Sequence, residues 1–374
     1  MKFLHLADLH IGKHLNKIPL FEDQKFVLQQ ALDLAQEENV DAIVVAGDVY
    51  DSSYPTNEAT EFYDWFLTAL HRLQKPILMI SGNHDSEERL GIANQILTND
   101  NIYIVTNVEK SLTPITIGGT NFYLLPYFRP SDINHAFGSE TKSFSEAFAL
   151  AVEKMNVDTS KQNVLVTHQA LLPKQGKLIS SGSETSLDIE DDKSVAGSET
   201  IDVSLAEDFD YVALGHIHKC QNIAKNARYC GALLHYYTDE VSLDRTFTIV
   251  TLENKKLTIT DYPVKPLRAF VVLTGTMEEL LAREGNEDDY VFVRLNEESY
   301  VDNPKAKLEA KYNHIVGLNY IGITAKQVET PEFENVEQVD KEDLFASFFL
   351  KYGGRELDED EKEFIHSVFE EEEA

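Results

Sequence analysis

The chain has 374 residues, of which 43% are hydrophobic and 26% are charged, a composition typical of a soluble globular protein with two or three domains. It contains no apolar run near the roughly 18 residues that are needed to span a bilayer. The opening stretch MKFLHLADLHIGK carries Asp and His where a signal peptide is apolar, so we expect a cytoplasmic protein without membrane contact. Two cysteines, Cys220 and Cys230, cannot staple a chain of this length, and we expect both to be reduced.

The formal net charge of −31 argues at first against a nucleic-acid partner, because phosphate binding normally relies on Lys and Arg. Part of the excess is local, since residues 331–374 hold 16 Asp or Glu and 4 Lys or Arg. The rest of the chain is still acidic. Divalent cations would add positive charge where carboxylates gather, and a basic partner protein could supply the remainder.

Up to about residue 262, short apolar runs alternate with amphipathic stretches, which is typical of layered α/β architecture. The pattern predicts strands at 2–7, 40–47, 75–82, 121–127, 163–168, 210–216, 245–253 and 255–264, and helices at 21–39, 56–73 and 143–155. Because the last two strands form a hairpin around Glu253 and Asn254 rather than enclosing a helix, we expect a mixed sheet or two packed sheets. Residues 173–200, rich in Ser, Gly and acidic residues, predict either a solvated loop or a flexible surface beside a site.

From about Pro263 the pattern changes to a β-α-β-α-β unit, with strands at 266–275, 289–296 and 314–323 and helices at 276–284 and 303–312. An acidic linker at 329–338 precedes two short helices, 341–354 and 357–373, joined at two glycines. We therefore expect a catalytic domain at 1–262, an accessory domain at 263–328, and a linker with a helical tail at 329–374.

The first tail helix carries an aromatic stripe at i, i+3, i+4 and i+7. The stripe consists of Phe345, Phe348, Phe349 and Tyr352. It fits packing against the neighbouring domain and docking of a partner helix or coiled coil equally well.

Polar residues follow five of the predicted strands at the point where each strand ends, which is where ligands bind in open α/β sheets. These residues are Asp8, His10, Asp48, Asn83, His84, His168, His216 and His218. One such residue is usually ordinary loop chemistry, but five strand ends with the same chemistry favour a site. Mixed imidazole, carboxylate and amide donors suit manganese, iron or zinc. Two such ions side by side form the clamp of phosphatases and nucleases, so the pattern predicts phosphoester hydrolysis.

The ordered series DLH, GDVYD, GNHD, THQ and GHIH resembles the five motifs of the calcineurin-like metallophosphoesterases. Three longer stretches, MKFLHLADLHIGK, AGDVYDSSYPTNEA and VALGHIHKCQ, resemble the SbcD family, the nuclease subunits of bacterial SbcCD DNA-repair complexes. The resemblance continues into PVKPLRAFVVLTGTMEELL, similar to the start of that family's capping domain, and less specifically into YGGRELDEDEKEF of the tail.

The resemblance implies a layered α/β/β/α sandwich with a small α+β capping domain and a C-terminal helical tail. It further implies that one metal ion is held by Asp8, His10 and His218, the other by Asn83, His168 and His216, and that Asp48 bridges both. His84 would face the scissile phosphate as an acid or as a stabilising group, while Asp85 would satisfy the turn.

The same resemblance implies two Mn²⁺ ions, a DNA substrate cut as an exonuclease and an endonuclease, and a role in repair, recombination and replication. The implied partner is an SbcC-like SMC ATPase, whose coiled coil would receive the tail helices. A homodimer within a heterotetramer is also implied. Phe62, Trp65 and Phe66 are candidates for its interface, although core packing explains them equally well.

Two departures from the family pattern limit what is carried over. Asp51 stands where archaeal and eukaryotic relatives have His, and residues 230–237 read CGALLHYY where bacterial members usually read Ser-Gly-Ser-Pro. We assign no function to Cys230 or His235 for this reason.

Two alternatives to the DNA nuclease stay open. A hydrolase of a small nucleotide would keep the metal site but would not need the accessory domain or the tail. A scaffold without activity would be expected to lose metal ligands, whereas this chain keeps all seven. The glycine-rich motifs of dinucleotide or ATP binding are missing from this sequence.

Overall fold

The computed structural model describes residues 1–172, 200–285, 287–322, 341–353 and 355–373, with some side chains of the last two helices left out. The predicted linker at 329–338 and the predicted loop at 173–200, apart from Thr200, lie outside the described residues. By its contacts the chain divides into two units. The first comprises residues 1–272 with 287–292, and the second residues 273–286 with 293–374.

The first unit contains a six-stranded sheet in the order β16-β15-β1-β4-β5-β6. Its strands are β1 (Lys2–Leu6), β4 (Ala42–Ala46), β5 (Ile77–Ile80), β6 (Ile102–Val105), β15 (Thr246–Glu253) and β16 (Lys256–Pro263). The strands β1, β4, β5 and β6 run parallel, whereas β15 pairs antiparallel to β1. Every residue of β4 and β5 is buried, which explains their uninterrupted apolar sequences.

A second six-stranded sheet has the order β13-β14-β12-β9-β8-β7. Its strands are β7 (Ile115–Ile117), β8 (Thr120–Leu125), β9 (Gln162–Thr167), β12 (Tyr211–Leu214), β13 (Gln221–Asn222) and β14 (Ala227–Tyr229). The four central strands are parallel, and the two edge strands β7 and β13 are antiparallel to their neighbours. The sequence predicts either one mixed sheet or two packed sheets, and the structure contains two sheets.

The two sheets pack face to face through one apolar cluster that draws on strands of both. Phe3 of β1 lies with its ring centroid 5.5 Å from that of Phe122 in β8 and 5.9 Å from that of Tyr211 in β12. His5 lies beside them, and its Nδ1 is 3.0 Å from the hydroxyl oxygen of Tyr211. These contacts fix how the two sheets, and hence their strand ends, meet.

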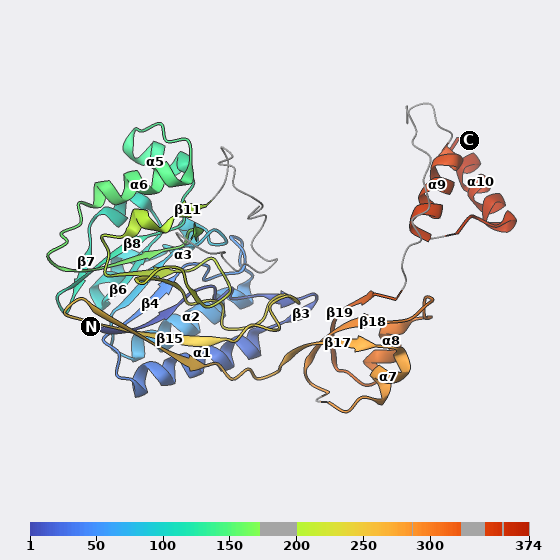
Figure 1. Ribbon diagram of the computed structural model, residues 1–374, viewed down its shortest axis with the longest axis horizontal. Coiled ribbons are helices and arrows are strands. Elements are labelled where there is room, and N and C mark those ends of the chain that lie inside the picture. Colours follow the sequence, from blue (N-terminus) through green and yellow to red (C-terminus); the bar gives the residue numbers. More distant parts are fainter. Residues whose placement is uncertain (173–199, 286, 323–340, 354, 374) are drawn as a thin grey trace. The chain divides into compact units, whose positions relative to one another are not determined.

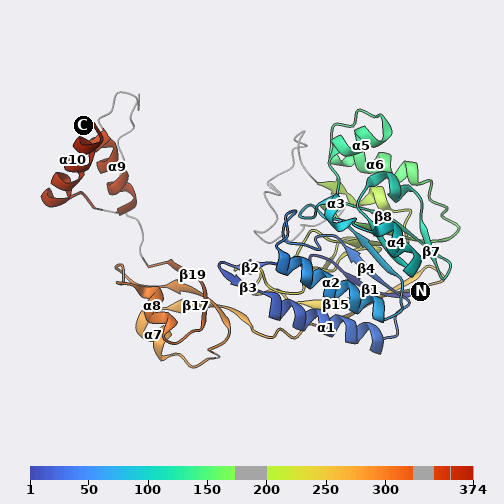
Figure 2. The same cartoon turned by 180° about the vertical axis from the view of Figure 1, so that it is seen from behind.

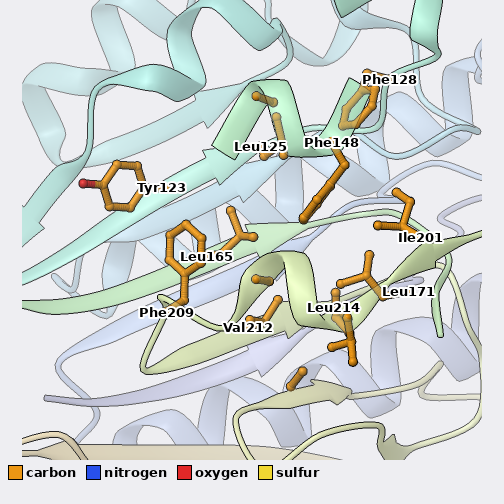
Figure 3. Packing of buried hydrophobic residues seen from close by; sticks show 14 of the residues in the cluster. Tyr123, Leu125, Phe128, Phe148, Leu165, Leu171, Ile201, Phe209, Val212 and Leu214 are labelled. Carbon is orange, nitrogen blue, oxygen red and sulfur yellow. The ribbon is translucent and has the colours of Figure 1, made fainter. Parts of the chain in front are cut away.

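Helices cover the outer face of each sheet (Figures 1 and 2). The helices α1 (Phe21–Glu37) and α2 (Asn57–Arg72) lie on the first sheet, and α5 (Pro130–Phe137) and α6 (Phe144–Met155) on the second. Figure 3 shows the second of these layers, where Phe148 of α6 lies over Leu165 of β9 and its neighbours. The α/β/β/α sandwich implied by the sequence is thus confirmed.

Shorter elements complete the first unit. They are β2 (His14–Leu15), β3 (Ile18–Pro19), α3 (Glu87–Leu90), α4 (Asn94–Leu97), β10 (Leu171–Leu172) and β11 (Ile201–Asp202), with 3₁₀ turns at Thr98–Asp100, Val108–Leu112 and Val203–Ala206. The sequence patterns do not predict these elements, nor β6, β7, β13, β14 and α5. The missed strands of the two large sheets lie at or next to a sheet edge and hold two to four residues, too few for a clear periodicity.

The predicted hairpin is confirmed, with its turn one residue further along. Glu253 of β15 pairs with Lys256 of β16, so Asn254 and Lys255 form the turn. Both have positive φ, 49° and 64°, as a two-residue turn matched to the twist of the strands requires.

The β-α-β-α-β succession predicted after Pro263 is present. It consists of β17 (Phe270–Gly275), α7 (Met277–Ala282), β18 (Tyr290–Leu295), α8 (Pro304–Glu309) and β19 (His314–Tyr320), with the strands in sequential order. Helix α7 begins with a capping box, in which Thr276 and Glu279 each accept a hydrogen bond from the other's backbone N–H.

The two predicted tail helices are α9 (Lys341–Gly353) and α10 (Glu359–Glu373). Phe345 and Phe349 stack with ring centroids 6.4 Å apart and line a small apolar groove between the helices. Phe348 is 59% exposed, and the side chain of Tyr352 lies outside the described residues. Among the helices that the structure describes, none combines the length and the apolar character needed to cross a membrane.

Candidate metal centre

The carboxyl ends of five strands from the two sheets meet at one place. Strands β1, β4 and β5 come from the first sheet, and β9 and β12 from the second. The loops that follow them bring together the eight predicted residues Asp8, His10, Asp48, Asn83, His84, His168, His216 and His218, as the contacts between them show.

The site has a buried side and an open side. Five of the eight residues expose 5% or less of their surface; these are Asp8, His10, Asp48, His168 and His218. Asn83 is exposed, and His84 and His216 are half-buried. A substrate can therefore approach from the side of these last three residues.

The backbone is strained at this site. Asp8, His10, Asp48 and His216 all have positive φ, between 46° and 93°, a region that residues with a Cβ seldom adopt. Cross-loop hydrogen bonds hold them there, from Asp8 N to Gly47 O at 3.1 Å and from His10 N to Asp48 O at 3.0 Å. Such strain is typical of functional sites, where the surrounding structure over-determines the conformation.

One cluster consists of Asp8, His10 and His218. The Nε2 atoms of His10 and His218 face each other at 3.1 Å. The buried Oδ2 of Asp8 has no hydrogen-bond partner among the described residues. An unpaired carboxylate oxygen beside two converging imidazole nitrogens is the donor set expected around a divalent cation, so these residues fit a metal ion.

A second cluster forms around the amide oxygen of Asn83. This Oδ1 lies 3.1 Å from His168 Nε2 and 3.1 Å from His216 Nδ1. Asp48 lies between the two clusters, with its Oδ2 at 3.3 Å from His168 Nε2 and 3.6 Å from His10 Nε2. The Asp48 carboxylate is thus placed to serve both clusters.

Ionised carboxylates dominate the electrostatics of this site. Burial disfavours the charge of Asp48, but His168 and His10 outweigh it and hold the pKa of Asp48 well below its ordinary value. Burial likewise opposes a charge on His168, yet Asp48 and Asp8 raise its pKa to about 9. The two carboxylates thus favour positive charge at this place, which a bound cation would supply.

His84 stands at the rim of both clusters. Its backbone N–H donates to Asp48 Oδ1 at 3.0 Å, and its Nδ1 lies 2.8 Å from the carbonyl oxygen of Asp51. Because a carbonyl accepts only, Nδ1 carries a proton and donates it to this oxygen. The ring also comes close enough to His10 and Asp48 to act as a ligand, so geometry alone allows either role.

Asp85 ties the loops after β4 and β5 together. Its carboxylate accepts hydrogen bonds from the backbone N–H groups of Gly82 at 2.8 Å, Tyr50 at 2.8 Å and Val49 at 3.1 Å. Burial and the neighbouring Asp48 raise the pKa of Asp85 to about 6. The three backbone hydrogen bonds agree with the expectation that Asp85 satisfies the turn.

Sequence reasoning missed several residues around the site. Glu240 accepts a hydrogen bond from His218 Nδ1 at 2.7 Å, and Arg245 donates to Glu240 at 2.6 Å. Asp51, whose role was left open, pairs with Lys13 at 3.0 Å. None of these residues follows an apolar strand directly, so no periodic signal marks them.

The two residues to which no function was assigned lie outside both clusters. Cys230 packs in the apolar cluster between the sheets. His235 donates from Nε2 to the carbonyl oxygen of Leu243 at 2.8 Å.

Close backbone approaches hold the site together, and they need glycine. A Cβ on Gly82 would lie 2.2 Å from Asp48 Oδ1 and 2.4 Å from Asp48 N. A Cβ on Gly215 would lie 2.0 Å from Ala46 O and 2.6 Å from His168 Nδ1. These two glycines let the loop after β5 reach Asp48 and let the two sheets meet.

Comparison with known proteins places this architecture in a class. Residues 1–220 match the family model described as calcineurin-like phosphoesterase, and residues 266–352 match that described as type 5 capsule protein repressor C-terminal domain. The first match spans more than half of the chain, so the protein is a calcineurin-like phosphoesterase.

Curated relatives narrow the class to one family. The D subunit of the nuclease SbcCD from Staphylococcus epidermidis is 33% identical over 330 residues, covering 86% of each chain. The protein of the same name from Staphylococcus saprophyticus is 30% identical over 376 residues, covering 98% of this chain and 97% of the relative. The chain belongs to the family of SbcD proteins, the D subunits of the nuclease SbcCD.

Solved structures of more distant proteins are also similar. A protein of Thermus thermophilus matches at 12% identity with a TM-score of 0.42, over 70% of this chain and 98% of that chain. A dimetal phosphatase from Danio rerio matches at 13% identity with a TM-score of 0.39, over 70% of this chain and 96% of that chain.

The close approach at Gly82 gives a testable prediction. In Gly82→Ala the new methyl group collides with Asp48, so the loop must shift and the protein should lose the rise in melting temperature that divalent metal ions produce. Gly285→Ala is the control, since a Cβ there meets nothing within 4 Å. Thermal unfolding with and without Mn²⁺ measures the effect. An unchanged metal-dependent shift in Gly82→Ala would show that the close approach of this loop to Asp48 is not needed.

Proposed function

We propose that the chain is a metal-dependent DNA nuclease, an exonuclease on duplex ends and an endonuclease on hairpin or single-stranded DNA, which acts in repair and recombination. The observation that carries the proposal is the position of the Asp48 carboxylate between the two ligand clusters, with Oδ2 at 3.3 Å from His168 Nε2 and 3.6 Å from His10 Nε2. The relatives named as nuclease subunits over nearly the whole chain support DNA as the substrate.

The two clusters support a specific distribution of ligands. One ion would be held by Asp8, His10 and His218 and the other by Asn83, His168 and His216, with Asp48 shared between them. Imidazole, carboxylate and amide oxygen together suit a borderline metal better than Ca²⁺ or a structural zinc. We propose Mn²⁺ as the activating ion.

When bound, two divalent ions lower the pKa of water and offset the charge of the phosphate that is attacked. The residues of the chain prepare this step. Strained loops hold Asp8 and Asp48 in place before substrate arrives, so no reorganisation is needed at the moment of reaction. The open side, marked by Asn83, His84 and His216, gives the phosphodiester access.

His84 is the proposed catalytic residue. Asp51 O fixes its Nδ1 proton, and its backbone N–H anchors it to Asp48. The ring therefore presents Nε2 as the atom that would deliver a proton to the leaving oxygen. We favour this role over that of a metal ligand because the family resemblance assigns the ligands to the other seven residues and leaves His84 to face the phosphate.

An open groove formed in part by residues close to His84 in the sequence offers room for a nucleic acid. The groove has a volume of about 520 Å³ and is lined by Ser53, Tyr54, Ser86, Glu88 and Arg89. Tyr54 is 77% exposed, and the Arg89 guanidinium lies 5.1 Å from the centre of its ring. An exposed aromatic ring and a guanidinium offer a base a stacking surface and a phosphate a cation.

The accessory parts fit a nuclease that works in a complex. We propose a catalytic domain at 1–262, a capping domain at 263–328 and a partner-binding tail at 329–374; the family matches end and begin on either side of residue 263. The proposed partner is an SbcC-like SMC ATPase, and the assembly a homodimer within a heterotetramer. Such a partner would bind most of the DNA, so the chain itself, with its net charge of −31, would need to contact only the phosphodiester that is cut.

We predict that purified protein cuts end-labelled duplex DNA with Mn²⁺ and that chelation stops it. His84→Ala should lower the cleavage rate by about 10²- to 10⁴-fold, the usual contribution of a general acid, while binding as many ions as the wild type. His71→Ala, an exposed position on α2, is the matched control. Loss of one bound ion in His84→Ala would instead make His84 a ligand. Full activity in that variant would exclude both roles.

The tail gives a second prediction. Phe345 and Phe349 face the groove between α9 and α10, so the more exposed Phe348 is the better candidate for a contact with the coiled coil. Phe348→Ala should weaken copurification with the SbcC-like ATPase and leave metal-dependent cleavage by the isolated chain unchanged. Tyr300→Ala, which removes an aromatic side chain that is 69% exposed, is the control. Equal copurification of the two variants would contradict the assignment.

A further inference from the structure

Behind the metal centre, a buried carboxylate holds the outer nitrogen of one proposed ligand. Glu240 has no exposed surface, and its Oε1 lies 2.7 Å from His218 Nδ1. Its other oxygen accepts from the backbone N–H of Tyr236 at 2.8 Å and from Arg245 Nη2 at 2.6 Å. A buried carboxylate with both oxygens engaged has one orientation available to it.

Arg245 contacts both Glu240 and His218. Its Nη1 donates to the carbonyl oxygen of His218, while its Nη2 holds Glu240. Arg245 is 7% exposed, so its charge is balanced inside the protein by Glu240. Backbone and side chain of His218 are thus fixed by one ion pair, to which the sequence patterns and the family motifs assign no role.

We propose that Glu240, held by Arg245, is a positioning residue that sets the affinity of the ion in the Asp8, His10 and His218 cluster. The inference rests on the proposed two-metal function. Since a carboxylate only accepts, His218 Nδ1 carries the proton, and Nε2 presents its lone pair toward His10. The negative charge of Glu240 also makes that lone pair a stronger donor, as carboxylates behind metal-binding histidines do.

The two clusters differ in this respect. His168, in the Asn83 cluster, bonds its Nδ1 to the neutral carbonyl oxygen of Ala46 at 2.7 Å. A carbonyl fixes the tautomer as Glu240 does, but it adds no negative charge. A change at residue 240 should therefore act on one ion and spare the other.

Glu240→Gln removes the negative charge of residue 240. The amide keeps the size of the side chain, and its oxygen can still accept from His218 Nδ1. Its NH₂ group must then face both Tyr236 N–H and Arg245 Nη2, which donate to the same oxygen of Glu240. Binding of one ion should weaken by about 10- to 100-fold, the usual cost of losing such a partner.

The experiment titrates metal-free full-length protein with Mn²⁺ by calorimetry, comparing wild type, Glu240→Gln and the exposed control Glu253→Gln. We expect two ions per chain in all three, with one of them about 10- to 100-fold weaker in Glu240→Gln. Cleavage by this variant should fall at low Mn²⁺ and return to near the wild-type rate when Mn²⁺ is raised. Arg245→Lys keeps the positive charge but lacks the two guanidinium nitrogens that bond Glu240 and the His218 carbonyl at the same time, so the affinity of the same ion should fall by a smaller factor. This variant provides a second measurement if Glu240→Gln does not fold.

Other outcomes overturn the inference. If both ions bind Glu240→Gln as tightly as wild type, Glu240 does not set metal affinity. If both ions weaken together, the metal-free protein melts earlier and excess Mn²⁺ restores nothing, the role of Glu240 is structural only. The titration does not depend on DNA. If the wild-type protein binds two ions but cuts no DNA, the proposed nuclease function is wrong, whereas the role of Glu240 in metal affinity can still be tested.

Discussion

The Asp48 carboxylate is the group on which the rest of the centre depends, because it lies between the two clusters and contacts a histidine of each. It is buried, lies 3.3 Å from His168 and 3.6 Å from His10, and accepts the backbone N–H of His84. A charge in such a place is costly unless it is paired. The packing of Phe3 against Tyr211, which brings the two sheets face to face, provides the pairing by placing imidazoles from both sheets around it.

Much of this could be predicted from sequence because the signal is local. Each central strand is an apolar run followed at once by a polar residue, so the strand, its end and the ligand type can be read together, as at Asp8 and His168. The order of strands in the two sheets is not local. Edge strands such as β7 are too short to give a periodic signal in the sequence. Glu240 contacts His218 from an irregular segment 22 residues further along the chain. Only the folded chain brings these two residues together.

Family membership and physical geometry answer different questions about this protein. Similarity over nearly the full length of the staphylococcal relatives assigns the family. The geometry adds how the ligands are held, with His168 on a neutral carbonyl and His218 on a buried ion pair. A centre built from two unequal halves could bind its ions in two separate steps, so its activity would depend on the weaker ion. The chain is acidic, whereas DNA phosphates bind to positive charge. Bound cations at this centre and a basic surface on a partner would supply that charge.

The most direct test of the account is the number of Mn²⁺ ions bound per chain at equilibrium, measured by dialysis and elemental analysis for wild type and Asp48→Asn. The account predicts two ions for wild type. It predicts that Asp48→Asn weakens both, because the side chain it replaces is shared. Retention of both ions by Asp48→Asn, or a single ion in wild type, would contradict a centre in which two clusters depend on one carboxylate.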